Sequence, residues 1–592
     1  IGKFSAAQVA GLTATQAPSL TTAQVGAMTD KQIAAITNAA FAKLSTDVIA
    51  GLSTTIKDGE KLSQVQALTA GQIAELDEGQ IQALTAGEDG QIAAFAPKQI
   101  AAFSSTQLNK MSTEQIGSIT AAQIALMTFT GETGQINNLS ADLVAGLSEE
   151  QVTALSDKQV ASFSTTQLAA MSTNQLAAIN NKDLAGLSND KINALSAEQF
   201  NAFTAAQVKT LTVDQVGHLD DEIIQGLGSE EIEAFTAAQL KALTITQMGK
   251  FSAEQIAMFS TASDNNQIAS LSAAQIGALS GDQVAGFTDT QIGKFSAAQV
   301  GAFTETQVPS LTEAQIGALS SVQIAALKAN VIDNLTTEQV AMFGTDATDS
   351  TEGSKSQIES LTTAQIGALT KDQLGAMTDA QVGQFSVAQI GALTDTQAPG
   401  LIPTQVAQFS TTQIAAIKAD TFAKLSTDVI AGLTTGASDS VDQIGALTAL
   451  QIGALTKDQI ENLQTPQVAA LTGKSLATLS STQLNQMSTD QVAAITAGQV
   501  ISLTATQITD MKVDLFGAIS DSAFAAITAT QFKSVTGAQI AAMSETQAAA
   551  MTVAQIGTLS EEQANSLTAE QLVKFDTQAK VEALKPALLA TL

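Results

Sequence analysis

Residues 311–327, LTEAQIGALSSVQIAAL, contain almost the same eight residues twice. The shared phrase is [LFMI]-[ST]-x-x-Q-[IV]-[AG]-[AGKS], and it recurs along the chain from Phe4 to Phe575. A repeat of short, fixed period usually builds one stack of similar units rather than several globular domains. We therefore expect a single repeat domain over residues 1–575, followed by a C-terminal capping or docking tail over residues 576–592.

Each octad carries the signature of a helix start. Ser or Thr followed three residues later by Gln has the spacing of a capping box, in which the hydroxyl accepts a hydrogen bond from a first-turn amide and the Gln side chain bonds back to the N–H of the cap. In the quoted stretch Thr312 and Gln315 hold these places. Leu311 and Ile316 stand at the two positions of a hydrophobic staple. The pattern predicts one short helix per octad.

Such a helix has room for about six residues, or roughly 9 Å, and is too short to be stable alone. It must pack on its neighbours, so we predict an all-α solenoid of very short capped helices. One continuous helix is excluded because its apolar stripe would rotate by about 80° per octad. A β-solenoid and a disordered chain are the less favoured alternatives, since positions one and six of the octad would point to opposite faces of a strand.

Five insertions interrupt the octads, each between the cap and the Gln. They are rich in Gly, Ser, Thr and acidic residues, so we expect exposed loops. The insertions lie at residues 85–91, 128–135, 260–267, 344–357 and 434–443. The loops, and three longer related segments that begin at Gln16, Gln307 and Gln397, are spaced by multiples of five octads. Five octads, about 40 residues, are therefore one candidate for a structural unit or coil, and segmental duplication without structural meaning is the other interpretation.

Composition narrows the classes of function. The chain of 592 residues has a formal charge of −30 and contains no Cys, Trp, Tyr or Arg. A strongly acidic chain without Arg is not expected to bind nucleic acid through its phosphates or to bind an anionic membrane. The absence of Cys excludes a disulfide framework and thiol catalysis. Because no run of 18 apolar residues occurs, we expect no membrane insertion.

We recognise no catalytic constellation and expect that the protein is not an enzyme. His218 is the single His, and it stands alone in DQVGHLDDE. Neither a Ser/His/Asp triad nor a zinc site with Cys and His ligands fits around it. Its place late in an octad predicts a structural role near a helix C-terminus.

The insertions are the one place where ligand chemistry is expected. Hard oxygen ligands on loops suit Ca²⁺, the only cofactor that the sequence suggests. No insertion has the EF-hand pattern, and ordinary solvated loops are the simpler interpretation. The candidate Ca²⁺ ligands are Glu88, Asp89, Glu132, Asp264, Asp346, Asp349, Glu352, Asp439 and Asp442.

The phrase L-[ST]-x-x-Q-[IV]-x-A resembles octapeptide tracts in very large secreted proteins of proteobacteria, which are described as surface, adhesin-like or calcium-binding proteins. The resemblance implies export and an extracellular or cell-surface location, and it carries over no catalytic residue. This chain lacks the Gly- and Asp-rich secretion repeats often found beside such tracts, so the export route is open. The chain opens in mid-repeat without Met, and we expect a mature, processed or truncated product.

Two functions follow as hypotheses. The first is a structural subunit of an extracellular fibre, sheath or surface layer, which assembles with copies of itself through solenoid ends or sides. The alternative is an adhesin stalk or binding scaffold whose acidic loops contact sugars such as a cell-surface polysaccharide, proteins or Ca²⁺.

Overall fold

The expected helix forms in almost every octad. The structure is a computed structural model that describes residues 1–346, 355–436 and 441–589. In α33 (Glu313–Ala318) the Thr312 side chain accepts a hydrogen bond from the Gln315 N–H at 3.1 Å, and Gln315 Oε1 accepts one from the Thr312 N–H at 2.8 Å. The helix ends where Leu319 returns to an extended backbone with φ −68° and ψ 132°. The next capping box then begins α34 (Ser321–Ala326).

The Nε2 group of the Gln at position five joins one coil to the coil before it. Gln175 Nε2 donates to the main-chain oxygens of Val144 at 3.0 Å and Leu147 at 2.6 Å, which lie 31 and 28 residues earlier. The same two separations recur at Gln339, whose Nε2 donates to Val308 and Leu311. The all-α solenoid is confirmed, and this ladder of Gln side chains is what ties one coil to the next.

One coil contains three to four octads. The ladder bonds span 28 to 31 residues, and helices three apart in the chain pack on one another, as α22 (Val213–Gly217) does on α25 (Ala237–Ala242). The coil is therefore shorter than the five octads that the loop spacing suggested. The physical reason is that the chain changes direction at the extended residue between two helices, and three to four such changes complete a circuit.

Insertions leave the coil unchanged. Gln365 Nε2 donates to the oxygens of Ile324 and Leu327, both at 2.8 Å, across separations of 41 and 38 residues. These separations are ten residues longer than usual, which matches the extra length of the insertion at 344–357. The capping box also survives an insertion, since Gln91 N donates to Thr85 Oγ1 at 2.9 Å and Gln91 Oε1 accepts from Thr85 N at 3.1 Å.

The structure adds a loop that the octad count concealed. Residues 53–64 form no helix, and the box bond from Ser53 N to Gln64 Oε1 spans 11 residues instead of three. This loop is longer than an ordinary cap segment by one full octad. The octads on either side therefore stay in register, and the sequence pattern alone does not reveal the insertion. Gly59, with φ 82°, supplies its left-handed turn.

The apolar residues at positions one and six form the core inside each coil. Leu311, Ile316 and Leu319 are all at most 4% exposed, and burying such a side chain stabilises the fold by about 1.5–3 kcal/mol. Phe residues at position one pack edge to face on those of the next octad, as Phe95 does on Phe103 with ring centroids 5.4 Å apart. The residues between the cap and the Gln face solvent.

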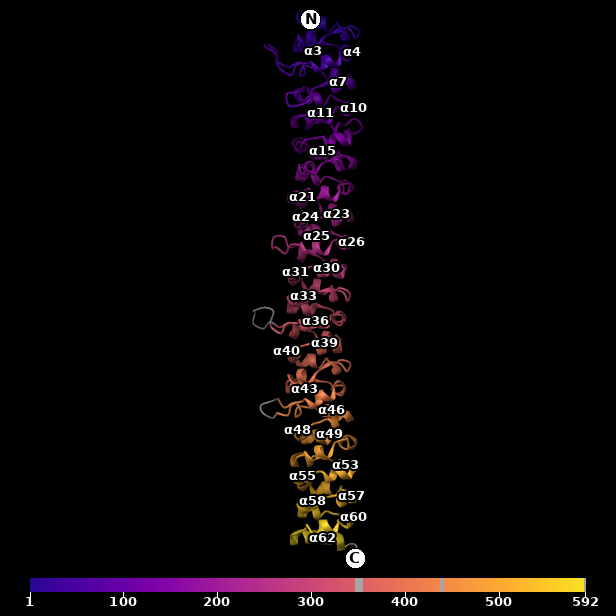
Figure 1. The fold of residues 1–592 in the computed structure, drawn as a ribbon, viewed down its shortest axis with the longest axis vertical. Helices are drawn as coiled ribbons and strands as arrows, with labels where there is room; N and C mark the ends of the chain where they lie inside the picture. Colours follow the sequence, from indigo (N-terminus) through magenta and orange to yellow (C-terminus); the bar gives the residue numbers. More distant parts are fainter. Residues whose placement is uncertain (347–354, 437–440, 590–592) are drawn as a thin grey trace. The chain divides into compact units, whose positions relative to one another are not determined.

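The chain divides into two compact units, Ile1–Lys294 and Phe295–Leu592. Within each unit the short helices follow one another along the stack in chain order (Figure 1). The second unit also contains the 12-residue helix α62 (Gln578–Leu589), which packs on α59 (Val553–Ile556) and α60 (Glu561–Asn565). None of the helices in the described part of the chain is long and apolar enough to cross a bilayer.

Candidate functional site

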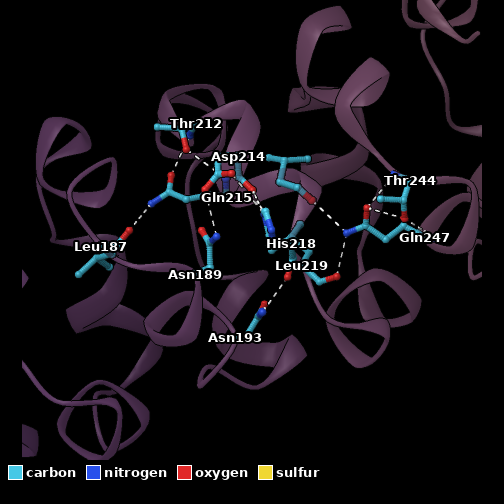
Figure 2. A network of polar contacts seen from close by, with 11 residues as sticks. Leu187, Asn189, Asn193, Thr212, Asp214, Gln215, His218, Leu219, Thr244 and Gln247 are labelled. Carbon is cyan, nitrogen blue, oxygen red and sulfur yellow. Dashed lines mark hydrogen bonds and ion pairs between the residues drawn. The ribbon is translucent and has the colours of Figure 1, made fainter.

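The surroundings of His218 are structural ones. His218 follows α22, and its Nδ1 lies 2.7 Å from the main-chain oxygen of Asp214 and 3.5 Å from Asp214 Oδ1 (Figure 2). Its own main-chain oxygen accepts a hydrogen bond from Asn193 Nδ2 at 2.7 Å. The ladder residues Gln215 and Gln247 lie on either side and bond to main-chain oxygens (Figure 2). These contacts are those of a helix C-terminus, as the sequence predicted.

The predicted Ca²⁺ ligands are not gathered into one site. Glu88, Asp89, Glu132, Asp264, Asp346 and Asp442 are all exposed and belong to five different loops. Asp349, Glu352 and Asp439 lie outside the described residues. Over residues 1–346, 355–436 and 441–589, no three Asp, Glu, His or Cys side chains are placed to share a metal ion. Calcium binding by the loops therefore stays a prediction without an assembled ligand set.

The loops are held by local bonds instead. In loop 85–91 the Gly87 N–H donates to Ser118 Oγ at 2.7 Å, and Gly87 takes a φ of 94°. In loop 434–443 the Asp442 carboxylate accepts a hydrogen bond from the Gly445 N–H at 2.7 Å. A carboxylate that already accepts a main-chain hydrogen bond has less free capacity for a metal ion.

A polar groove lies beside loop 85–91. It encloses about 410 Å³ and is bordered by Glu88 and Glu150 and by Ser118, Thr120 and Ser148, whose hydroxyls each accept a main-chain hydrogen bond. The sequence singles out Glu88 but not Glu150, because Glu150 stands in an ordinary octad without an insertion. Only the coiling of the chain brings Glu150 close to Glu88. This arrangement of acceptors and hydroxyls suits a polyhydroxylated ligand or a hydrated cation.

Two related grooves occur in the second unit, where Pro replaces the small residue at position seven. There the α-helix gives way to the 3-10 helices η3 (Val308–Ser310) and η4 (Ala398–Gly400), because Pro lacks the N–H that continues an α-helix. The grooves enclose about 290 and 410 Å³. Their equivalent borders are Thr304, Glu305, Thr306 and Lys328 in one groove and Thr394, Asp395, Thr396 and Lys418 in the other.

The acids in these grooves are already engaged. Asn330 Nδ2 donates to Glu305 Oε1 at 2.7 Å, and Thr421 Oγ1 donates to Asp395 Oδ1 at 2.9 Å. The grooves are shallow and present ordinary surface side chains. They are features of the duplicated segments that begin at Gln307 and Gln397.

Comparison with solved structures requires one correction. One similar chain is described as "Structure of APUM23-GGAUUUGACGG"; it has 9% identity and a TM-score of 0.16, and the match covers 82% of this chain and 87% of that chain. A second is described as "Structure of APUM23-GGAGUUGACGG"; it has 11% identity and a TM-score of 0.14, and the match covers 63% of this chain and 85% of that chain. Both descriptions name a U-containing nucleotide sequence, so the exclusion of nucleic acid as a partner is withdrawn. That exclusion was wrong in its reasoning, because a net charge is a sum over the chain and does not describe any one face. TM-scores this low carry no argument for a particular ligand.

The family comparison bears on the repeat itself. No curated protein matches the chain. The model of the ALTTAQ repeat matches residues 92–128 and 176–213, which lie within the octad tract. Together with the helix that forms in almost every octad, this match identifies the chain as a repeat protein with an α-solenoid fold.

Proposed function

We propose that this chain is a structural scaffold, a subunit of an extracellular fibre, sheath or surface layer. The observation that carries the proposal is the ladder, in which one Gln per octad closes its own helix and also bonds to the preceding coil, as Gln175 does. Repetition of one such unit extends a structure without any new contact type. The extracellular location rests on the resemblance to octapeptide tracts of secreted proteins.

The ladder also suggests how copies would join. The two faces of a coil differ, because one presents Gln Nε2 donors and the other presents main-chain oxygen acceptors, as seen between Gln339 and the oxygens of Val308 and Leu311. Two unlike faces that fit each other produce a head-to-tail contact, which extends into an open polymer when the rotation between copies does not close a ring. Such a contact between copies would use the same bonds that hold coils together within one unit.

Electron microscopy of the purified full chain, with Ca²⁺ and then with a chelator, tests the proposal. We expect filaments of constant width. Filaments that vanish on chelation would place Ca²⁺ at the junctions between copies. Separate particles under both conditions would contradict a self-assembling scaffold.

The second candidate is a binding scaffold, and the polar groove beside loop 85–91 favours it because Glu88 and Glu150 both border that groove. The discriminating variant replaces the insertions by Gly/Ser sequences of equal length. Filament formation should survive this change if the stacked coils are the functional part. Loss of polysaccharide binding in the same variant, with folding intact, would instead favour the binding scaffold.

A further inference from the structure

Position five of the octad faces main-chain oxygen atoms and calls for a hydrogen-bond donor. Gln207 Nε2 donates there to the oxygens of Leu176 at 3.0 Å and Ile179 at 2.8 Å. Other polar residues at this position also donate. Lys191 Nζ, for example, donates to the oxygen of Ala161 at 2.5 Å. Apolar residues such as Val48 and Leu143 also occupy this position and supply no donor, so the fold tolerates the loss of single ladder bonds.

Two residues of the first unit place a carboxyl group at this position, and Asp183 is the clearer one. Asp183 occupies position five in α18 (Asn181–Leu184) and is 0% exposed. Neither of its carboxylate oxygens makes a hydrogen bond of good geometry to the described residues, although the Asn180 side chain lies close enough to lower the pKa of the carboxyl. The ladder bonds of Gln175 and Gln207 span 31 and 28 residues, and the same register sets Asp183 opposite the oxygens of Val152 and Leu155. By this register, the Asp183 carboxylate, which can only accept hydrogen bonds, faces main-chain oxygens, which can also only accept them.

Glu231 is the second exception. It occupies position five in α24 (Ser229–Ala234) and is 4% exposed. Its side chain has the same length as Gln, and one of its carboxylate oxygens lies beside Gly228, the residue at the N-cap. In the orientation of a capping Gln amide, the second carboxylate oxygen would take the place of Nε2. By the ladder register of 31 and 28 residues, it faces the oxygens of Phe200 and Phe203.

A charged carboxylate is unfavourable in this place. Its oxygen would face carbonyl oxygens while withdrawn from water, and an uncompensated buried charge is strongly destabilising. A protonated carboxyl instead has one O–H donor, which restores the missing ladder bond. We propose that Glu231 and Asp183 each hold a proton in place of the Gln amide, so that deprotonation weakens the coil contacts of the Ile1–Lys294 unit.

The charged groups around both acids agree with this assignment. For Asp183, burial raises the pKa of the carboxyl most strongly and the Asp157 carboxylate raises it further, whereas the nearby side chains of Asn180 and Lys182 lower it. For Glu231, burial again raises the pKa most strongly and Glu230 adds to it, whereas the main-chain N–H groups of Glu231 and Gly228 lower it. In both cases the pKa lies above that of an ordinary carboxyl.

The sign of the pH effect follows from linkage. Between the ordinary carboxyl pKa and the raised one, the folded state binds more protons than the unfolded state. Stability is then complete below the ordinary value and falls as the pH rises through the raised value. The first unit should therefore be more resistant to unfolding in acid than at alkaline pH.

Thermal unfolding of the full chain between pH 4 and pH 8, followed by hydrogen exchange in the first unit, tests the proposal. We expect Glu231→Gln to raise the unfolding midpoint of that unit at pH 8 and to leave it unchanged near pH 4. Glu230→Gln is the matched control, because Glu230 is exposed and the change removes the same charge one residue away. Parallel curves for the unaltered chain and for Glu231→Gln would overturn the proposal.

A direct titration keeps the test independent of folding effects. Carbon-13 NMR of the side-chain carboxyls should show Glu231 and Asp183 ionising above the other acidic residues. Ordinary titration of both would contradict the assignment. Recovery of the pH 8 midpoint on adding Ca²⁺, but not NaCl of matched ionic strength, would also overturn it and would assign a cation to the place of the proton.

Discussion

At the scale of the residue, the Gln at position five makes more contacts than its capping role requires. Gln175 Oε1 accepts from the Ser172 N–H at 2.7 Å, while its Nε2 donates to main-chain oxygens of the preceding coil. Each such bond contributes about 0.5–1.5 kcal/mol, and each buried group left without a partner costs about 1–3 kcal/mol. The side chain is therefore both an element of local structure and a tertiary link.

Gln175→Leu should lower the free energy of unfolding of the first unit by about 2–4 kcal/mol, because it leaves the Ser172 N–H and two main-chain oxygens without partners. Chemical denaturation measures the change. Gln82→Leu is the matched control, since Gln82 is exposed, and its effect should stay within about 0.5 kcal/mol. Equal effects of the two substitutions would show that the ladder bonds contribute nothing.

Asp183→Gln should stabilise the first unit by about 1–3 kcal/mol at neutral pH, because the amide donates to the main-chain oxygens without first having to bind a proton, as the Asp183 carboxyl must. Thermal unfolding of the full chain measures the shift. The exposed Asp190 provides the control substitution Asp190→Gln, for which we expect no comparable gain. A lower midpoint for Asp183→Gln would mean that the buried carboxyl makes a favourable contact of its own.

At the scale of the element, each helix depends on its cap, and some octads lack one. Lys418 precedes α44 (Ala419–Phe422) at the cap position and makes no capping bond, whereas Thr37 caps the equivalent helix α4 (Asn38–Phe41) in the first unit. A hydroxyl at the N-cap typically contributes about 1 kcal/mol. The octad tolerates the loss because packing on neighbouring coils holds the helix in place.

Lys418→Thr should therefore raise the free energy of unfolding of the second unit by about 1 kcal/mol, as measured by denaturant titration. Lys424→Thr, at an exposed position after the helix, serves as the comparison and should change little. If Lys418→Thr leaves the free energy of unfolding unchanged, packing of the Lys418 side chain stabilises the unit by about as much as the Thr cap would.

The helix elements could be predicted closely from the octad, because the capping box and the staple specify both the start and the length of α33. The loop at 53–64 could not, since an insertion of one octad leaves the register intact. The burial of Gln175 was also beyond the sequence pattern: capping explains one end of the amide, and only the coil explains the other. The groove beside Glu88 depends on coiling in the same way.

At the scale of the whole molecule, the formal charge of −30 affects the stability of both units. Like charges on the surface repel, and salt screens them over about 8–10 Å at physiological strength. We expect the unfolding midpoints to rise as NaCl is increased from low concentration. A midpoint independent of salt would mean that the acidic residues are too widely spread to interact.

The Gln ladder closes each coil after three to four octads. The chain has no Cys, so an engineered pair reports the coil directly. A Cβ atom added at Gly383 would lie 3.0 Å from Gln408 Cβ, three octads further on, so a small outward shift brings the two Cβ atoms to the roughly 3.5–4.5 Å that a disulfide needs. Mild oxidation of Gly383→Cys/Gln408→Cys should form that disulfide rapidly, and Gly383→Cys/Ala423→Cys, five octads apart, should not. Rapid disulfide formation in the second pair alone would contradict the account and support a coil of five octads.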